Sequence, residues 1–106
     1  MAKSKTNVVK FIHSDPGHAW LAVKTRELSE LGIADKITQF SFVKGKTTYL
    51  EEDADMATYV TAQKERGVTV EIRQGRVWPQ KCPVRYFAKY EAPVSQTVET
   101  AEAVAA

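Results

Sequence analysis

The chain has 106 residues, of which 43% are apolar and 26% are charged, and its formal net charge is +2. These proportions are typical of a single soluble domain and exclude a disordered polyelectrolyte, and so small a charge is no signature of general polyanion binding. The single cysteine, Cys82, excludes an internal disulfide and a metal site built on paired thiolates, and we expect it to be semi-buried. No apolar run approaches the roughly 20 residues of a membrane span, and the basic N-terminus lacks the apolar stretch of a secretory signal. A cytoplasmic location is therefore the default expectation.

The first third of the chain predicts a β-hairpin followed by a helix. Residues 7–12 and 18–23 have strand-forming composition, and Ser14-Asp-Pro-Gly17 between them has the chemistry of a tight turn. Residues 25–32 predict a short helix with Thr25 as N-cap, ended by Gly32.

The middle of the chain repeats this order. Residues 36–43 predict a strand with Phe40 and Phe42 on one face, followed by a turn at Lys44-Gly45 and a returning strand at 47–50. Residues 53–67 predict the best helix, because apolar residues recur at helical spacing and acids precede bases along it. Residues 68–72 alternate as a strand whose inward side chains are Val68, Val70 and Ile72.

The resulting order, β-β-α-β-β-α-β, predicts an α+β fold with a mainly antiparallel sheet and two helices on one face. Residues 73–83 contain two prolines and a glycine and predict a loop, and residues 84–91 predict a final edge strand. We expect a single domain over residues 1–92 and a disordered tail over 93–106, which is small, polar and rich in alanine.

Three short motifs resemble small uncharacterised proteins encoded by tailed bacteriophages. They are DPGHAWL at 15–21, LGIADKI at 31–37 and YLEEDAD at 49–55, and the resemblance covers about residues 8–72. It implies a phage or prophage origin and a bacterial cytoplasm. It implies no activity.

The stretch HSDPGHAW, residues 13–20, places His13, Asp15 and His18 around a turn. Imidazole and carboxylate groups bind transition metals, so these three residues are a candidate metal site, and with Glu51 or Glu52 they suggest a metal-dependent hydrolase. The chain has no third histidine. The simpler interpretation is that Asp15 caps the turn and the histidines flank it, while Trp20 is a core aromatic.

The acidic run Glu51-Glu-Asp-Ala-Asp55 allows three interpretations. Acids at a helix N-terminus are explained by capping and by the helix dipole, but paired carboxylates also bind Mg²⁺ or form a docking surface.

Residues 73–90 form the most basic and aromatic segment. We single out six candidate binding residues, which are Arg73, Arg76, Trp78, Arg85, Phe87 and Lys89. Exposed Trp and Arg are common anchors of protein interfaces, while bases and rings together also suit single-stranded nucleic acid. Positive charge on an edge strand also guards against aggregation, so a purely structural role stays open.

The sequence thus favours a phage-type accessory protein that binds a bacterial host or phage protein without catalysis and without a cofactor. Nucleic-acid binding through residues 73–90 is the alternative, and the hydrolase is the third hypothesis. No glycine-rich phosphate loop and no nucleophile–base pair argues for an enzyme. We expect no membrane partner, and surfaces of opposite charge would permit head-to-tail self-association.

Overall fold

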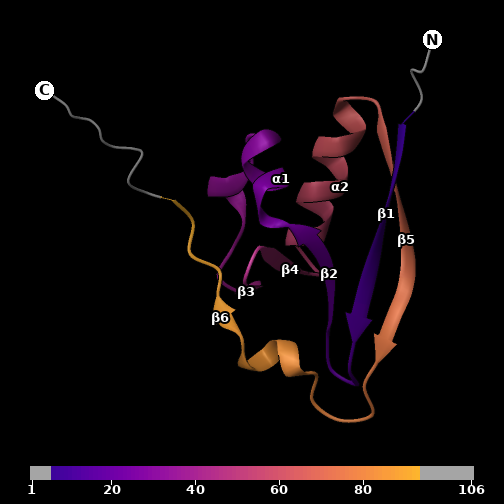
Figure 1. Cartoon of the computed structure of the whole chain (residues 1–106), viewed down its shortest axis with the longest axis vertical. Helices are drawn as coiled ribbons and strands as arrows, with labels where there is room; N and C mark the ends of the chain where they lie inside the picture. The colour runs from indigo at the N-terminus through magenta and orange to yellow at the C-terminus, as the bar shows by residue number, and fades with distance from the viewer. Residues whose placement is uncertain (1–5, 94–106) are drawn as a thin grey trace, which may run out of the picture.

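The computed structural model describes residues 6–93, which form a six-stranded mixed sheet with two α-helices (Figure 1). The strands are β1 (Thr6–Ser14), β2 (Ala19–Lys24), β3 (Phe42–Lys44), β4 (Thr47–Glu51), β5 (Val68–Val77) and β6 (Ala88–Lys89). The helices are α1 (Thr25–Glu30) and α2 (Asp55–Glu65), with single 3-10 turns at Ala34–Lys36 and Pro83–Tyr86. The predicted α+β class and element order are confirmed. Residues 94–106 of the predicted tail lie outside the described residues.

The strands lie side by side in the order β5-β1-β2-β4-β3-β6. β1 and β5 are parallel, and every other pair is antiparallel. The two edges of the sheet are therefore β5 and β6, which the chain connects through residues 78–87. Figure 1 shows this connection running below the sheet from one edge to the other.

Both helices pack on one face of the sheet, as the sequence predicts. Successive side chains of a strand point to opposite faces, so Leu21 and Val23 of β2 and Leu50 of β4 share the face that the helices cover. Leu28 of α1 and Tyr59 of α2 complete this main core. Each fully buried aliphatic side chain of this kind contributes about 1.5–3 kcal/mol of transfer free energy, so this layer supplies most of the hydrophobic stabilisation.

A second, smaller core lies on the opposite face. It consists of Trp20 packed against Cys82 and Val84, with partly buried aromatic side chains around them, which are Phe42, Tyr49, Trp78 and Phe87. Cys82 is 1% exposed, more deeply buried than the sequence suggests, and burial raises the pKa of its thiol. Two residues that the sequence assigns to a loop, Trp78 and Cys82, thus belong to a hydrophobic core.

The predicted glycine ends of both helices are confirmed, but the predicted N-cap of α1 is wrong. Gly32 and Gly67 adopt positive φ of 73° and 82° just after α1 and α2, as a left-handed helix end requires. Thr25 is the first helical residue rather than the N-cap, which is Lys24. Its hydroxyl instead lies 2.7 Å from the Thr48 hydroxyl of β4 and ties α1 to the sheet.

The predicted strand at 36–43 is wrong over most of its length, because the extended chain begins only at Phe42. The reason is a set of side-chain hydrogen bonds to a buried carboxylate. Thr38 donates its N–H and hydroxyl to the buried Asp55 carboxylate, and the Ser41 hydroxyl donates to the same group at 2.6 Å. These bonds fold the segment onto the start of α2, so Phe40 does not share a face with Phe42 and is 68% exposed.

The sequence predicts a loop from residue 73, and this is wrong for residues 73–77, which form the second half of β5. Gly75 makes this continuation possible, because the His13 ring lies where a side chain on Gly75 would stand. Just before this half of the strand, Ile72, which the sequence predicts to face inward, is 40% exposed.

The predicted strand at 84–91 shrinks to two residues. Pro83 starts a 3-10 turn, in which Arg85 and Phe87 donate backbone N–H groups to the carbonyls of Cys82 and Val84. Only Ala88–Lys89 pairs with the sheet. No helix within residues 6–93 is long and apolar enough to cross a bilayer.

Candidate binding groove

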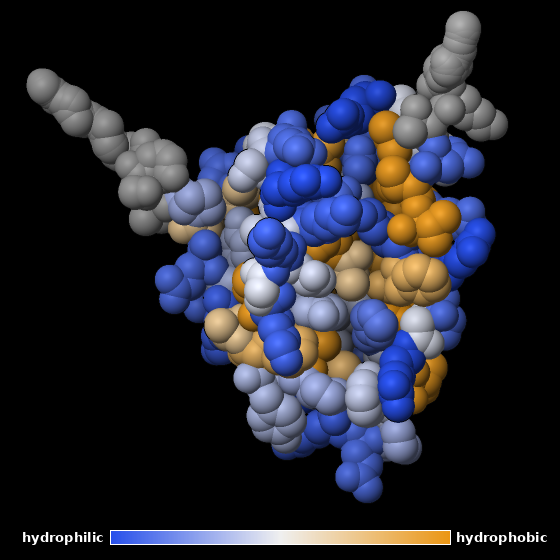
Figure 2. Space-filling view, viewed as in Figure 1, coloured by the Kyte–Doolittle hydropathy of each residue, from blue (hydrophilic) through white to orange (hydrophobic). Residues whose placement is uncertain are grey.

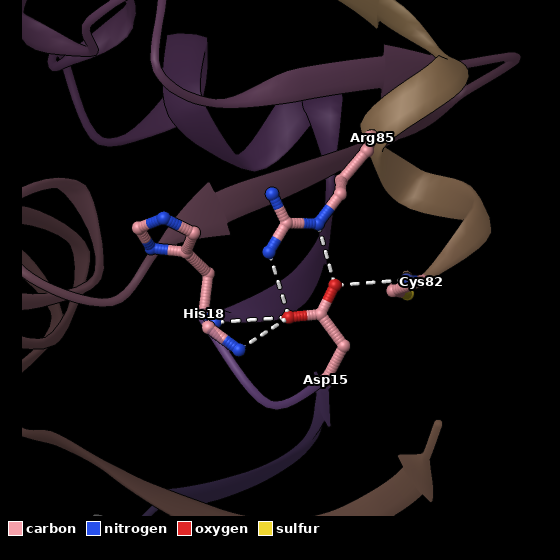
Figure 3. A network of polar contacts seen from close by, with 5 residues as sticks. Asp15, His18, Cys82 and Arg85 are labelled. Carbon is pink, nitrogen blue, oxygen red and sulfur yellow. Dashed lines mark hydrogen bonds and ion pairs between the residues drawn. The ribbon is translucent and has the colours of Figure 1, made fainter. Parts of the chain in front are cut away.

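Asp15 holds the histidine turn and the 82–85 segment together (Figure 3). Its side chain is fully buried and accepts hydrogen bonds from five N–H groups. Two come from its own turn, Gly17 N at 2.9 Å and His18 N at 3.0 Å, and one comes from Cys82 N at 2.8 Å. The other two come from the Arg85 guanidinium, whose Nη2 lies 2.8 Å from Oδ1 and whose Nε meets Oδ2. Residues about 70 apart in sequence are thereby fixed to each other.

This setting keeps Asp15 ionised. The Arg85 guanidinium holds the pKa of the Asp15 carboxyl far below its usual range, and the three backbone N–H groups act in the same direction against the effect of burial. A carboxylate with all its lone pairs engaged by protein donors has no vacant coordination site for a metal. The role of the Asp15 side chain is therefore structural.

The two histidines point into different surroundings. Nδ1 of His13 accepts a hydrogen bond from the backbone N–H of Arg76 at 3.2 Å, and the ring lies against Gly75 and Tyr49. Burial lowers the pKa of His13, which suits an acceptor nitrogen. His18 is exposed and tilts over Trp20 with ring centroids 5.9 Å apart.

The predicted metal site at His13, Asp15 and His18 therefore does not assemble. Within residues 6–93 no three His, Cys, Asp or Glu side chains are placed to hold one ion. Asp15 caps the turn, in agreement with the simpler interpretation of the sequence.

The acidic run leads into α2 and places Asp55 in its first turn, as the dipole suggests, but the N-cap is Ala54 and no side chain caps the helix. Glu51 accepts a hydrogen bond from the Ala54 N–H at 3.1 Å, and Asp55 is 1% exposed and holds Thr38 and Ser41. Asp53 is exposed. Two of the acids are thus committed to the fold, and Asp53 is free to face a ligand.

The six candidate residues of the basic-aromatic segment are spread along the chain from strand β5, at one edge of the sheet, to strand β6, at the other. Arg73 pairs with Glu71 on the outer strand β5, and the Arg76 guanidinium lies 4.7 Å from the centre of the Trp78 ring. Phe87 is half-buried against Tyr49, with the Lys44 ammonium 5.0 Å above it. The remaining two, Arg85 and Lys89, lie toward the opposite edge.

Those last two residues line a groove of about 570 Å³. It opens where the histidine turn, the start of α2 and strands β3 and β6 meet. Its aromatic side chains are Trp20, Phe40 and Phe42, with His18 beside them, and its polar side chains are Gln39, Glu51, Asp53, Arg85 and Lys89.

Trp20 is one of the side chains that line the groove. Its ring is 2% exposed, packs edge-on against Phe42 at 6.2 Å and lies 5.4 Å from the Arg85 guanidinium. Its indole Nε1 is buried and has no hydrogen-bond partner within residues 6–93. Burying a polar group without a partner costs about 1–3 kcal/mol, so an acceptor that reached this N–H would recover that cost.

Sequence reasoning missed the groove residues from 39 to 42. The aromatic pair Phe40 and Phe42 was visible, but regular strand alternation assigns both to one sheet face. Only the turn imposed by Asp55 separates them and leaves Phe40 at the rim of the groove.

Comparison of the chain with protein-family models, with curated proteins and with solved structures finds no match.

Proposed function

We propose that this domain binds a segment of another protein in the groove at Trp20, and that it acts by binding and not by catalysis. The observation that carries the proposal is the buried indole N–H of Trp20, which has no partner within residues 6–93 and belongs to a side chain that lines an aromatic groove. A peptide carbonyl or carboxylate oxygen would supply the acceptor that this donor lacks.

The chemistry of the groove favours an extended peptide with an apolar anchor. Phe40 is 68% exposed and Phe42 half-buried, and together they offer an apolar side chain a place out of water. Among the lining side chains Lys89 offers donors and Asp53 offers acceptors, which suits a main chain with both N–H and C=O groups. Mixed charge of this kind does not favour nucleic acid, whose backbone requires a consistently positive surface.

The Trp20 N–H is covered in the free protein, so a ligand reaches it only by displacing a covering side chain. His18 is exposed and tilted over the Trp20 ring, so it is the side chain whose displacement we expect. Binding should therefore change the surroundings of Trp20, and its fluorescence reports this once Trp78 is replaced by Phe.

The test is selection of a random peptide library on the immobilised full chain, followed by fluorescence titration of the enriched peptides. We expect enriched peptides to share an aromatic or aliphatic anchor, and Phe40→Ala to weaken binding about tenfold or more. Tyr86→Ala is the matched control, because Tyr86 is also an exposed aromatic (74%) but does not line the groove. Peptides that bind both variants as tightly as the parent chain would refute the groove as the site.

The resemblance to phage-encoded proteins makes bacterial host proteins the first partners to test. The enriched peptide motif then identifies candidate host segments, and each is titrated against the parent chain and the same two variants.

A further inference from the structure

The outer strand β5 has one side without a partner. It spans Val68–Val77, the longest strand of the described chain, and pairs only with β1. Figure 1 shows β5 at the flank of the molecule, with no described element beyond it. A free edge of this length presents a row of backbone N–H and C=O groups to which another strand can bind.

Apolar side chains gather around this edge. Four of the six exposed large apolar side chains within residues 6–93 lie on β1 and β5, and these are Val9, Phe11, Ile72 and Val77. Ile12 packs on the main core, so Val9 and Phe11 alternate onto the opposite face, away from the helices. Figure 2 shows apolar surface on the helix side of the same flank. The second core covers the central strands and leaves this part of the sheet uncovered.

The charges of β5 have a particular spacing. Glu71 and Arg73 are two residues apart on one face, and Arg73 Nε lies 2.7 Å from Glu71 Oε2. Both side chains are about half exposed, 47% and 56%, so this pair contributes little to stability and is easily exchanged.

We propose that β5 pairs antiparallel with β5 of a second copy of this chain, with the two-fold axis at Ile72. Antiparallel pairing that places Glu71 opposite Arg73 of the second copy must also place Arg73 opposite Glu71 and Ile72 opposite itself. Two cross-strand ion pairs form on one face of the joined sheet, and the two Ile72 side chains meet on the other.

The neighbouring positions accept this register. Val70 lies opposite Gln74, and Thr69 opposite Gly75, so no like charges and no proline oppose each other between residues 68 and 76. Each Ile72, 40% exposed in the single chain, gains an apolar neighbour. The self-complementary charge order is the reason to commit to a second copy, since an unrelated strand would match it only by coincidence.

The dimer closes on itself, because both β5 edges are used in one two-fold contact. The groove lies toward β6, at the other edge of the sheet. Pairing at β5 therefore leaves both grooves open, and the joined molecule presents two of them. This inference does not depend on what the groove binds.

The first test is sedimentation equilibrium of the full chain and of charge-reversed variants. Glu71→Arg and Arg73→Glu each place like charges opposite each other at both sites, so each should dimerise at least about tenfold more weakly than the parent chain. An equimolar mixture of the two variants restores opposite charges across the contact and should form a heterodimer. The double exchange, E71R with R73E, should dimerise like the parent chain.

The second test is cysteine cross-linking. Ile72→Cys should form an intermolecular disulfide under mild oxidation, because directly opposed residues of an antiparallel pair lie about 4.5–5.5 Å apart. Thr69→Cys is the matched control, since in this register the two copies of residue 69 lie about 20 Å apart. The parent chain controls for Cys82, which is buried.

Three results would overturn the proposal. A parent chain that stays monomeric at about 1 mM, the weak limit of useful association, excludes the dimer. A dimer that neither charge reversal weakens excludes this contact. Cross-linking at position 69 without cross-linking at 72 excludes this register.

Discussion

Asp15 is the residue on which the candidate site depends most. One carboxylate makes the tight turn through Gly17 and His18 and fixes Cys82 and Arg85 across it. These hydrogen bonds therefore join the turn to the second core, and they hold Arg85 where its guanidinium lies 5.4 Å from the centre of the Trp20 ring.

Asp15→Asn should lower the free energy of unfolding by about 3 kcal/mol near neutral pH, because Arg85 loses its counter-charge inside a partly buried pair. The loss should shrink in acid. In the folded chain the pKa of Asp15 is lowered, chiefly by Arg85, whereas in the unfolded chain it is about 4. The unfolded chain thus binds more protons as the pH falls below that value, and the parent chain loses the stability that the Asp15→Asn variant already lacks.

Urea unfolding at several pH values, followed by far-UV circular dichroism, measures this difference. Asp53→Asn is the control, since Asp53 is exposed and takes part in none of the hydrogen bonds described for residues 6–93. A gap between Asp15→Asn and the parent chain that stays constant down to about pH 3 would contradict the assignment.

At the scale of elements, β5 is where structure departs furthest from expectation. Its second half carries the glycine that the sequence assigns to a loop, yet the strand runs on to Val77 and Trp78 N–H donates to the Ser14 carbonyl at 2.8 Å. Gly75 gives the His13 ring room, and His13 in turn accepts the Arg76 N–H. One absent side chain thus couples β1, β5 and the histidine turn.

Gly75→Ala should destabilise the fold by about 1–3 kcal/mol, the usual cost of overpacking. A Cβ at this position would lie 2.8 Å from His13 Cε1 and 3.0 Å from the Ile12 carbonyl oxygen, and the backbone atom cannot move aside. Thermal unfolding of Gly75→Ala, compared with Arg73→Ala on the same strand, measures the effect. An unchanged midpoint for Gly75→Ala would mean that β1 and β5 are not held this closely.

The whole molecule is a sheet with a core on each face, and the two cores share strands β2 and β4. Leu21 and Leu50 face the helices, while their neighbours Trp20 and Tyr49 face the 78–87 segment. Neither core can be lost while these strands stay ordered, so the domain should unfold in one transition.

Leu28→Ala tests this coupling. Leu28 is completely buried in the main core, and its truncation should cost about 2–5 kcal/mol. Both tryptophans belong to the second core, so their fluorescence reports the other face. The fluorescence and circular dichroism transitions should move together to lower urea concentration. Separate midpoints would show that the two faces unfold independently.

The sequence by itself determined the elements whose signals are local. The first hairpin, both helices, the glycine ends of those helices and the α+β order follow from turn chemistry and from apolar periodicity, which act within a few residues. The role of Asp15 as a cap was visible for the same reason, because Pro16 and Gly17 beside it already define a turn.

Only the tertiary structure decided what depends on residues far apart in the chain. Asp55 reorganises residues 38–41 from 14 or more positions away, and Asp15 binds Arg85 across 70. A strand pattern cannot reveal a distant carboxylate that competes for its backbone N–H groups. The groove at Trp20 and the free edge at β5 both result from the order of the strands in the sheet. This order brings residues 20, 40 and 89 together and leaves β5 outermost. Strand order is set by packing rather than by local sequence.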